Sequence, residues 1–251
     1  DERLTYLRNL EERKEEVIRL IDEQGKLTEE LESQIREAEV LQRVEDLYKP
    51  FKKKKATRAS KAREKGLEPL ALIFRAQEKE SGSIEELAEP FISEEKGVAS
   101  AEEAVQGACD IIAEMISDDP ELTAAARERT AQTGMITTEA ADPEEKSVYD
   151  MYYEYSEGIS KIPNHRVLAV NRGEKEKKLK VKVVTDPERM EKLIADEIIT
   201  NEKSIFTDLL RETIADAYKR LMAPSAEREM RNMLTERAEA EAVKVFAKNT
   251  E

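Results

Sequence analysis

Leucine, isoleucine and valine recur every three to four residues along the first part of the chain, with charged side chains between them. This spacing predicts a long amphipathic helix ending at Gly25, because glycine adopts the left-handed conformation at little cost. A second helix is predicted from Thr28 to Tyr48, with Thr28 as its N-cap. The short turn favours an antiparallel hairpin within the chain, although the same heptad-like spacing also fits a two-chain coiled coil.

Capping signals mark a series of shorter helices after Pro50. Ser83 and Ser100 are each followed three residues later by glutamate, as in a capping box. Further helix starts are predicted at Pro69, Asp119-Pro120, Asp142-Pro143, Asp186-Pro187 and Pro224 or Ser225. The apolar spacing also predicts a helix over residues 206–221. Three or four such short helices within roughly 60 residues are compatible with a helix-turn-helix-like unit.

One region has the pattern of β-strands. Residues 166–170 are an apolar run, and residues 179–184 alternate apolar side chains with lysine. A charged loop joins the two runs, which therefore predict a small β-hairpin. The predicted fold is mainly α, with a multi-helix core, a long helical hairpin and this one small β-hairpin.

Composition excludes several classes of function. The single cysteine cannot form an internal disulfide, and one cysteine with one histidine cannot build a Cys/His zinc site. One histidine also leaves little material for a catalytic triad. The chain has no glycine-rich phosphate loop, no apolar run near the ~20 residues of a membrane span, and no apolar signal segment. These features predict a cytoplasmic, non-catalytic binding protein without metal or cofactor and without membrane contact.

The net charge of −14 conceals a strongly basic segment. Residues 49–65 carry nine basic side chains and one acidic one, giving +8 and leaving −22 on the rest of the chain. Such a run is a candidate for phosphate contacts; alternatively, it is a solvated connector that pairs with the acidic body. The candidate nucleic-acid-binding residues in it are Lys52, Lys53, Lys54, Lys55, Arg58, Lys61 and Arg63.

Three further candidates, His165, Arg166 and Arg172, lie around the predicted hairpin. One interpretation is contact with phosphate or a partner; the other, favoured for His165, is a ring packed at the start of a strand and bonded to a backbone carbonyl. Tyr149, Tyr152, Tyr153 and Tyr155 are expected on the helix from Asp142, where packing is favoured over base stacking. Cys109 is expected in the core.

Several blocks of sequence resemble the bacterial Tex transcription accessory proteins, in the same order and across essentially the whole chain. The densest runs from Ile162 to Glu176. The others are Asp46–Lys52, Thr57–Ala59, Ala62–Ala71, Glu94–Val98, Glu103–Ala108, Ile111–Glu114, Ala217–Leu221, Pro224–Glu227, Arg237–Ala242 and Val245–Asn249.

The resemblance implies that the chain is a fragment: most of the N-terminal helical region of a longer protein, without the RNase-H-like, helix-hairpin-helix and OB-type RNA-binding domains. It also implies a helix-turn-helix-like unit at residues 58–157, inserted between core pieces at 1–57 and 158–251. The implied function is that of a non-catalytic scaffold associated with RNA or DNA. The alternative is a protein-interaction module that docks transcription or ribosome machinery without touching nucleic acid.

Overall fold

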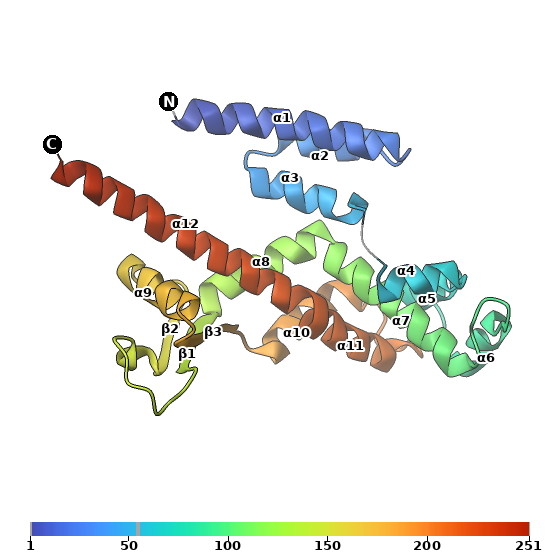
Figure 1. Cartoon of the computed structure of the whole chain (residues 1–251). Coiled ribbons are helices and arrows are strands. Elements are labelled where there is room, and N and C mark those ends of the chain that lie inside the picture. The colour runs from blue at the N-terminus through green and yellow to red at the C-terminus, as the bar shows by residue number, and fades with distance from the viewer. Residues whose placement is uncertain (1, 54–55, 251) are drawn as a thin grey trace. The chain divides into compact units, whose positions relative to one another are not determined.

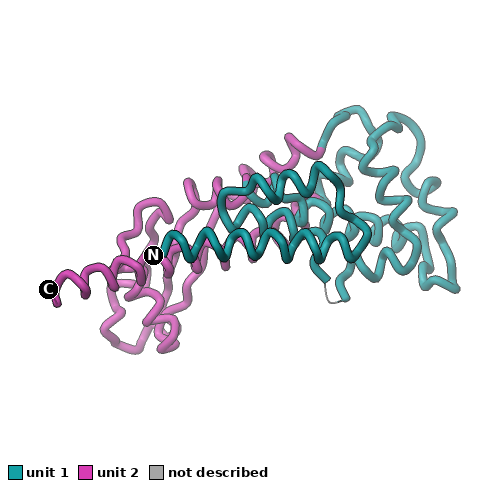
Figure 2. Tube along the Cα trace, turned by 90° about the horizontal axis from the view of Figure 1, so that it is seen from above, with its two compact units in different colours: residues 1–124, 199–213 teal, residues 125–198, 214–251 magenta. Residues whose placement is uncertain are grey.

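The computed structural model describes residues 2–53 and 56–250, and this part of the chain is mainly α-helical with one small antiparallel sheet (Figure 1). The mainly α prediction is confirmed. Two compact units are present, each built from two separate pieces of chain (Figure 2). Unit 1 contains the described residues up to Ala124 and Ile199–Thr213, and unit 2 contains Ala125–Ile198 and the described residues from Ile214 onward. The three-part division at residues 57/58 and 157/158 stays a prediction.

Unit 1 is built from helices. They are α1 (Glu2–Glu23), α2 (Glu29–Glu37), α3 (Leu41–Tyr48), α4 (Arg58–Glu64), α5 (Glu68–Ala76), α6 (Ile84–Ala88), α7 (Ala101–Asp118) and the first parts of α8 (Pro120–Thr133) and α11 (Thr207–Asp216), with short 3-10 turns η1 (Lys49–Phe51) and η2 (Glu89–Phe91). Pro69, Ser83, Ser100 and Asp119 all lie at the helix starts that the sequence predicts.

The first three helices pack around one apolar core within the chain, to which α1 contributes Val17 and Ile21. Gly25 has a φ of 68° after α1, and the Thr28 hydroxyl accepts from the Leu31 amide at 3.1 Å. The helix predicted from Thr28 to Tyr48 is wrong in one respect: the backbone is extended at residues 38 and 40, which divides it into α2 and α3. This break lets both pieces contribute to the core of α1, and buried Lys14 donates to the Arg36 carbonyl at the end of α2.

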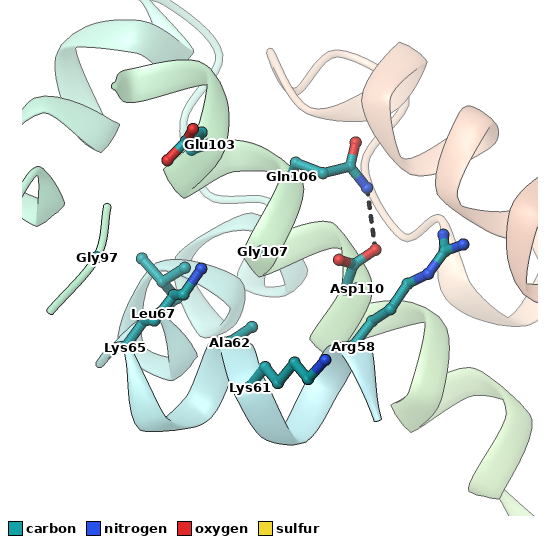
Figure 3. A pocket seen from close by; sticks show the side chains of 10 residues that line it. All are labelled: Arg58, Lys61, Ala62, Lys65, Leu67, Gly97, Glu103, Gln106, Gly107 and Asp110. Carbon is teal, nitrogen blue, oxygen red and sulfur yellow. Dashed lines mark hydrogen bonds between the residues drawn. The ribbon is translucent and has the colours of Figure 1, made fainter. Parts of the chain in front are cut away.

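α4 and α7 pack closely because Gly107 lies between them (Figure 3). A Cβ atom at Gly107 would lie 2.3 Å from Leu67 Cδ1 and 3.4 Å from the Ala62 side chain. Leu67 is buried directly against this position. Because glycine has no side chain, α4 and the turn after it can approach α7 closely at Gly107.

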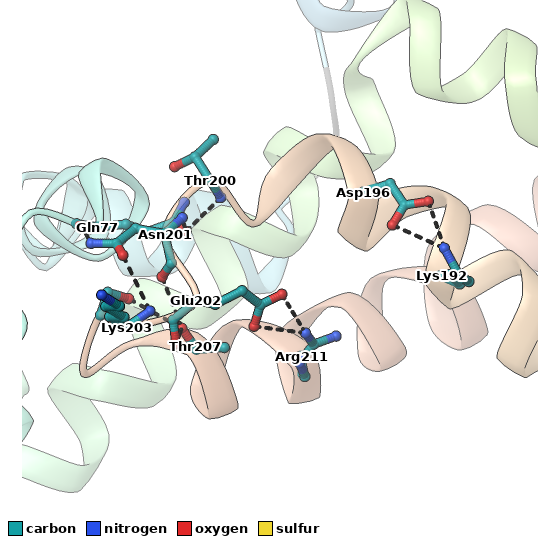
Figure 4. A network of polar contacts seen from close by, with 10 residues as sticks. Gln77, Lys192, Asp196, Thr200, Asn201, Glu202, Lys203, Thr207 and Arg211 are labelled. Carbon is teal, nitrogen blue, oxygen red and sulfur yellow. Dashed lines mark hydrogen bonds and ion pairs between the residues drawn. The ribbon is translucent and has the colours of Figure 1, made fainter.

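The second piece of unit 1 is held by the buried side chain of Gln77 (Figure 4). Its Oε1 accepts from the backbone amides of Thr200 at 3.0 Å and Asn201 at 3.4 Å, and its Nε2 donates to the Arg75 carbonyl. The Asn201 side chain returns a bond to the Gln77 carbonyl. The rings of Phe74 and Phe206, 5.1 Å apart, pack beside this network, so polar and apolar contacts together fix residues 199–213 in unit 1.

Unit 2 contains a sheet with strand order β2-β1-β3. Its elements are the rest of α8, β1 (Met135–Ala140), the 3-10 turn η3 (Asp150–Tyr152), β2 (Glu154–Gly158), α9 (Asn164–Lys175), β3 (Leu179–Val184), α10 (Pro187–Ile198), the end of α11, the π-helix η4 (Ala217–Met222) and α12 (Ala223–Asn249). The central strand β1 pairs antiparallel with both neighbours, with Thr138 opposite Tyr155 and Val181. Residues of the sheet, α9 and α12 form one core.

The predicted β-hairpin is only half right. Residues 179–184 form β3, but residues 166–170 lie in α9, where Val167, Val170 and Gly173 are buried at helical spacing. Packing of this face in the core it shares with α12 overrides the strand-like composition. α9 ends at Lys175, and Lys177 just beyond its C-cap has a φ of 61°. The partner of β3 is β1, which contains an Ile-Thr-Thr run with alternating burial and was not among the predicted elements.

The helix predicted from Asp142 is also wrong. The segment forms turns and then β2, because short polar side chains bond the local backbone in place of helical carbonyls. Asp142 Oδ1 accepts from the Glu144 amide, and Asp150 Oδ1 accepts from the Ser147 amide at 2.8 Å.

Pro224 explains the π-helix that precedes α12. A proline has no N–H to donate and its ring crowds the carbonyl four residues back, so regular α-helix through this point is unfavourable. The Ala223 amide instead bonds the Tyr218 carbonyl, five residues back. The helices predicted for residues 206–221 and from Pro224 are therefore joined without a loop.

We expect Gly107→Ala to lower the free energy of unfolding by about 1 kcal/mol. Overpacking against Leu67 costs about 1–3 kcal/mol, and the better helix preference of alanine returns about 1 kcal/mol. Urea denaturation measures the change. Leu67→Ala should cost less in the Gly107→Ala background than in the wild type; equal costs would contradict the contact. Gly158→Ala is the control, since its nearest neighbour lies 3.9 Å away.

Gln77→Ala is expected to destabilise unit 1 by about 2 kcal/mol, because it leaves two backbone amides without their acceptor. Amide hydrogen exchange at Thr200 and Asn201 should accelerate in the variant. Gln132→Ala, which changes an exposed glutamine, should leave both stability and these exchange rates unchanged. Unchanged exchange in Gln77→Ala would rule out the proposed role of this side chain.

Candidate nucleic-acid interface

Two cations lie on one face of α4, and a third, Lys65, continues this face at the C-cap of the helix. Arg58, Lys61 and Lys65 are spaced by three and four residues, and all three are exposed, while Ala59 and Ala62 between them are buried. Thr57 and Ser60 form a reciprocal capping box that starts the helix, and Gly66, with a φ of 77°, ends it. We call Arg58, Lys61 and Lys65 the α4 basic face.

The α4 basic face forms one wall of an open pocket of about 390 Å³ between α4 and α7. The opposite wall carries Glu103, Gln106 and Asp110 of α7, as Figure 3 shows. Apolar atoms of Ala62 and Leu67 and the backbone of Gly107 complete the lining. The site therefore combines cations, carboxylates and a small apolar floor.

Among residues 2–53 and 56–250, no carboxylate forms an ion pair with the α4 basic face. The nearby carboxylates are engaged locally: Glu103 accepts from the Ala99 amide at 2.8 Å, and Asp110 accepts from Gln106 Nε2 at 2.9 Å. These cations are accordingly open to an external anion.

The other candidates of the basic segment behave differently. Lys52 lies 3.7 Å from Glu45 and its ammonium lies 5.9 Å from the centre of the Tyr48 ring. Arg63 pairs with Glu114 at 2.8 Å, and Lys49 donates to the Ser117 carbonyl at 2.7 Å. Lys53 is exposed, and Lys54 and Lys55 lie outside the described residues. Part of the run thus pairs with the acidic body.

The three candidates near the predicted hairpin all lie on α9, in unit 2. His165 is exposed in the first turn of this helix, so the interpretation of a ring packed at a strand start is wrong. Arg166 pairs with Glu157 at 3.2 Å and lies over the Tyr155 ring, with 5.7 Å from its guanidinium carbon to the ring centre. Arg172 is exposed near the end of α9.

The tyrosine cluster packs as expected, although on turns and a strand. Tyr149 and Tyr152 are buried in the core of unit 2, and Tyr153 and Tyr155 pack partly buried against it. The hydrogen bond from the Tyr149 hydroxyl to Glu176 raises the pKa of that tyrosine. Cys109 is buried, as predicted.

Sequence reasoning missed the α7 side of the pocket and Lys96. The Lys96 ammonium lies 3.2 Å from where a Cβ would stand on Gly66, beside Lys65. The small residues Ala59, Ala62 and Gly107 are the sequence feature that corresponds to the contact between α4 and α7. No set of three or more His, Cys, Asp or Glu side chains in the described residues is arranged to hold a metal ion, and none of their helices is long and apolar enough to cross a membrane.

Comparison with known proteins now adds to this geometry. The family model described as Tex central region-like matches residues 79–246, more than half of the chain. The chain belongs to the Tex central region-like family. The resemblance to Tex proteins that the sequence blocks indicated is thereby confirmed.

Individual Tex relatives match over nearly the whole chain. The protein YdcI of Bacillus subtilis (strain 168) is 47% identical over 99% of this chain and 35% of its own length. The transcriptional accessory protein Tex of Neisseria gonorrhoeae is 33% identical over 99% of this chain and 33% of its own length. The human S1 RNA-binding domain-containing protein 1 is 29% identical over 98% of this chain and 26% of its length. The chain thus spans about a third of the bacterial relatives.

Proposed function

We propose that this chain is a non-catalytic helical part of a Tex-like transcription accessory protein and that it contacts RNA or DNA through the α4 basic face. The observation that carries the proposal is the exposure of Arg58, Lys61 and Lys65 on one face, without carboxylate partners among the described residues. Two relatives, which are named as a transcriptional accessory protein and an S1 RNA-binding domain-containing protein, support an association with nucleic acid.

The charge distribution supports contact at this face in particular. A chain of net charge −14 repels a polyanion over most of its surface, so binding depends on a local concentration of unpaired cations. Lys52, Arg63 and Arg166 already neutralise protein carboxylates and offer less to phosphate. The α4 basic face, with exposed Lys96 beside Lys65, gathers cations that can bind phosphate without first breaking such pairs.

The proposal includes the absence of catalysis and a cytoplasmic location, where bacterial transcription takes place. The first part is supported by His165, which is exposed and has no hydrogen-bond partner among the described residues, because a histidine that acts as general acid or base is held in place by a partner. Cys109 is buried among α7 core residues and not presented to a substrate.

The triple variant Arg58→Gln, Lys61→Gln, Lys65→Gln is expected to weaken binding of a labelled oligouridine at low salt by at least tenfold. The plot of log affinity against log salt concentration should become shallower, its slope decreasing in magnitude by about 2, because each lost single-strand phosphate contact removes about 0.7. Fluorescence anisotropy at several salt concentrations measures both. The matched control Lys175→Gln, Lys180→Gln, Lys182→Gln removes the same charge from exposed positions of unit 2 and should change little. Equal losses in the two variants would contradict the proposal.

A second candidate function is docking of transcription or ribosome machinery, and one feature of unit 2 favours it. The loop between β1 and β2 exposes 88% of Val148 and 61% of Met151 amid the exposed acidic residues Asp142, Glu144 and Asp150. Its conformation is fixed by bonds from the Ser147 amide to Asp150 and from the Tyr149 amide to Ser147. A rigid apolar tip with an acidic rim suits a basic protein surface.

Under this alternative, Val148→Ser combined with Met151→Ser reduces binding to purified bacterial RNA polymerase or ribosomes at least fivefold in co-sedimentation, and oligouridine binding stays unchanged. The matched control, Val243→Ser with Met233→Ser, alters exposed apolar residues of α12. Binding that is insensitive to the loop variant would exclude this docking surface.

A further inference from the structure

The pocket between α4 and α7 contains a hydrogen-bonding wall opposite its cations. Gln106 and Asp110 are one turn apart on α7, and Gln106 Nε2 donates to Asp110 Oδ1 at 2.9 Å. This bond fixes the orientation of the amide, whose nitrogen faces the carboxylate. In Figure 3 the second oxygen of Asp110 points away from Gln106 and carries no bond to the residues drawn.

The chemistry of this wall is that of an acceptor. An ionised carboxylate accepts hydrogen bonds through both oxygens and donates none, and the oxygen that bonds Gln106 keeps a second lone pair. A ligand group facing Asp110 must therefore present N–H or O–H donors, while the group facing Arg58, Lys61 and Lys65 must be anionic. The apolar atoms of Ala62 and Leu67 between them suit a flat ring.

Among the bases of nucleic acids, guanine meets the acceptor wall best. Its N1–H and N2–H₂ are adjacent donors that match the two oxygens of a carboxylate. Adenine and cytosine present a donor beside an acceptor, and the N3–H of uracil lies between two acceptors, so each of these places a lone pair against the carboxylate. The pocket volume of about 390 Å³ lies in the range of small-ligand sites.

We infer that this pocket binds a guanine nucleotide, with its phosphate on the α4 basic face and the donor edge of the base on Asp110. The inference rests on the proposed function and narrows it from nucleic acid in general to a preference for one base. Two sources carry the same chemistry: a guanosine within a single strand, and a free guanine nucleotide.

The test compares a labelled oligouridine with the same oligomer carrying one central guanosine, both bound to the full chain in anisotropy measurements. We expect the guanosine to raise wild-type affinity about five- to tenfold, the discrimination of one good bidentate pair. Asp110→Asn should abolish this preference and leave oligouridine affinity equal or higher, because it removes a negative charge beside the cations. Glu102→Gln, which neutralises an exposed carboxylate on the same helix outside the pocket, should keep the preference.

Competition with free GMP and AMP separates the two sources. Displacement of the guanosine oligomer by GMP alone indicates that a free nucleotide occupies the pocket, and no displacement by either assigns the site to guanosine within a strand. Absence of a guanosine preference in the wild type, or its persistence in Asp110→Asn, overturns the inference. Failure of the proposed function looks different: oligouridine affinity is then unaffected by the triple α4 variant.

Discussion

Leu67 and Ala62 occupy the space that a side chain at Gly107 would fill, and the features of the candidate interface follow from this contact. The close approach buries the alanine side of α4 and thereby turns Arg58, Lys61 and Lys65 away from α7's core face. It also brings Gln106 and Asp110 into the same pocket as these cations. A helix of seven residues has little stability of its own, so its position depends on this packing and on the capping box at Thr57.

Pairing between distant residues decides which cations of the basic segment remain available. Within the segment, Lys52 and Arg63 neutralise Glu45 and Glu114, as a connector that pairs with the acidic body would. The α4 basic face forms no ion pair among the described residues, and phosphate contact there stays a prediction. Exposed ion pairs contribute little stability, so the Lys52–Glu45 contact matters more for removing charge from the surface than for holding the fold. Net charge alone, whether −14 overall or +8 locally, does not describe the electrostatics of this surface.

Local signals were sufficient for much of the fold. Helix caps and tight turns depend on interactions between residues that are close in sequence, so they can be predicted from the local residue types. Examples are the caps at Thr28, Ser100 and Asp119 and the turn at Gly25. Two of the errors arise where long-range packing decides: α9 is helical because its buried face packs in a shared core with α12, and β1 exists because β3 and β2 pair with it. The helix predicted from Asp142 fails for a local reason, the bonds of Asp142 and Asp150 to nearby backbone amides. The charge run pointed to α4, but its partners on α7 are some 45 residues away in sequence, beyond the reach of any local pattern.

The hydrogen bonds that Gln77 accepts from the Thr200 and Asn201 amides join two segments of unit 1 that are synthesised at different times. During translation the helices α1 to α7 emerge early, yet the segment that completes their unit follows only after the 74 residues from 125 to 198. At a rate of roughly 5–20 residues per second, that interval lasts on the order of 4–15 s. Throughout it the Phe74 ring lacks Phe206 and the carboxamide of Gln77 lacks its amide partners, so unit 1 stays incomplete until residues 199–213 are synthesised.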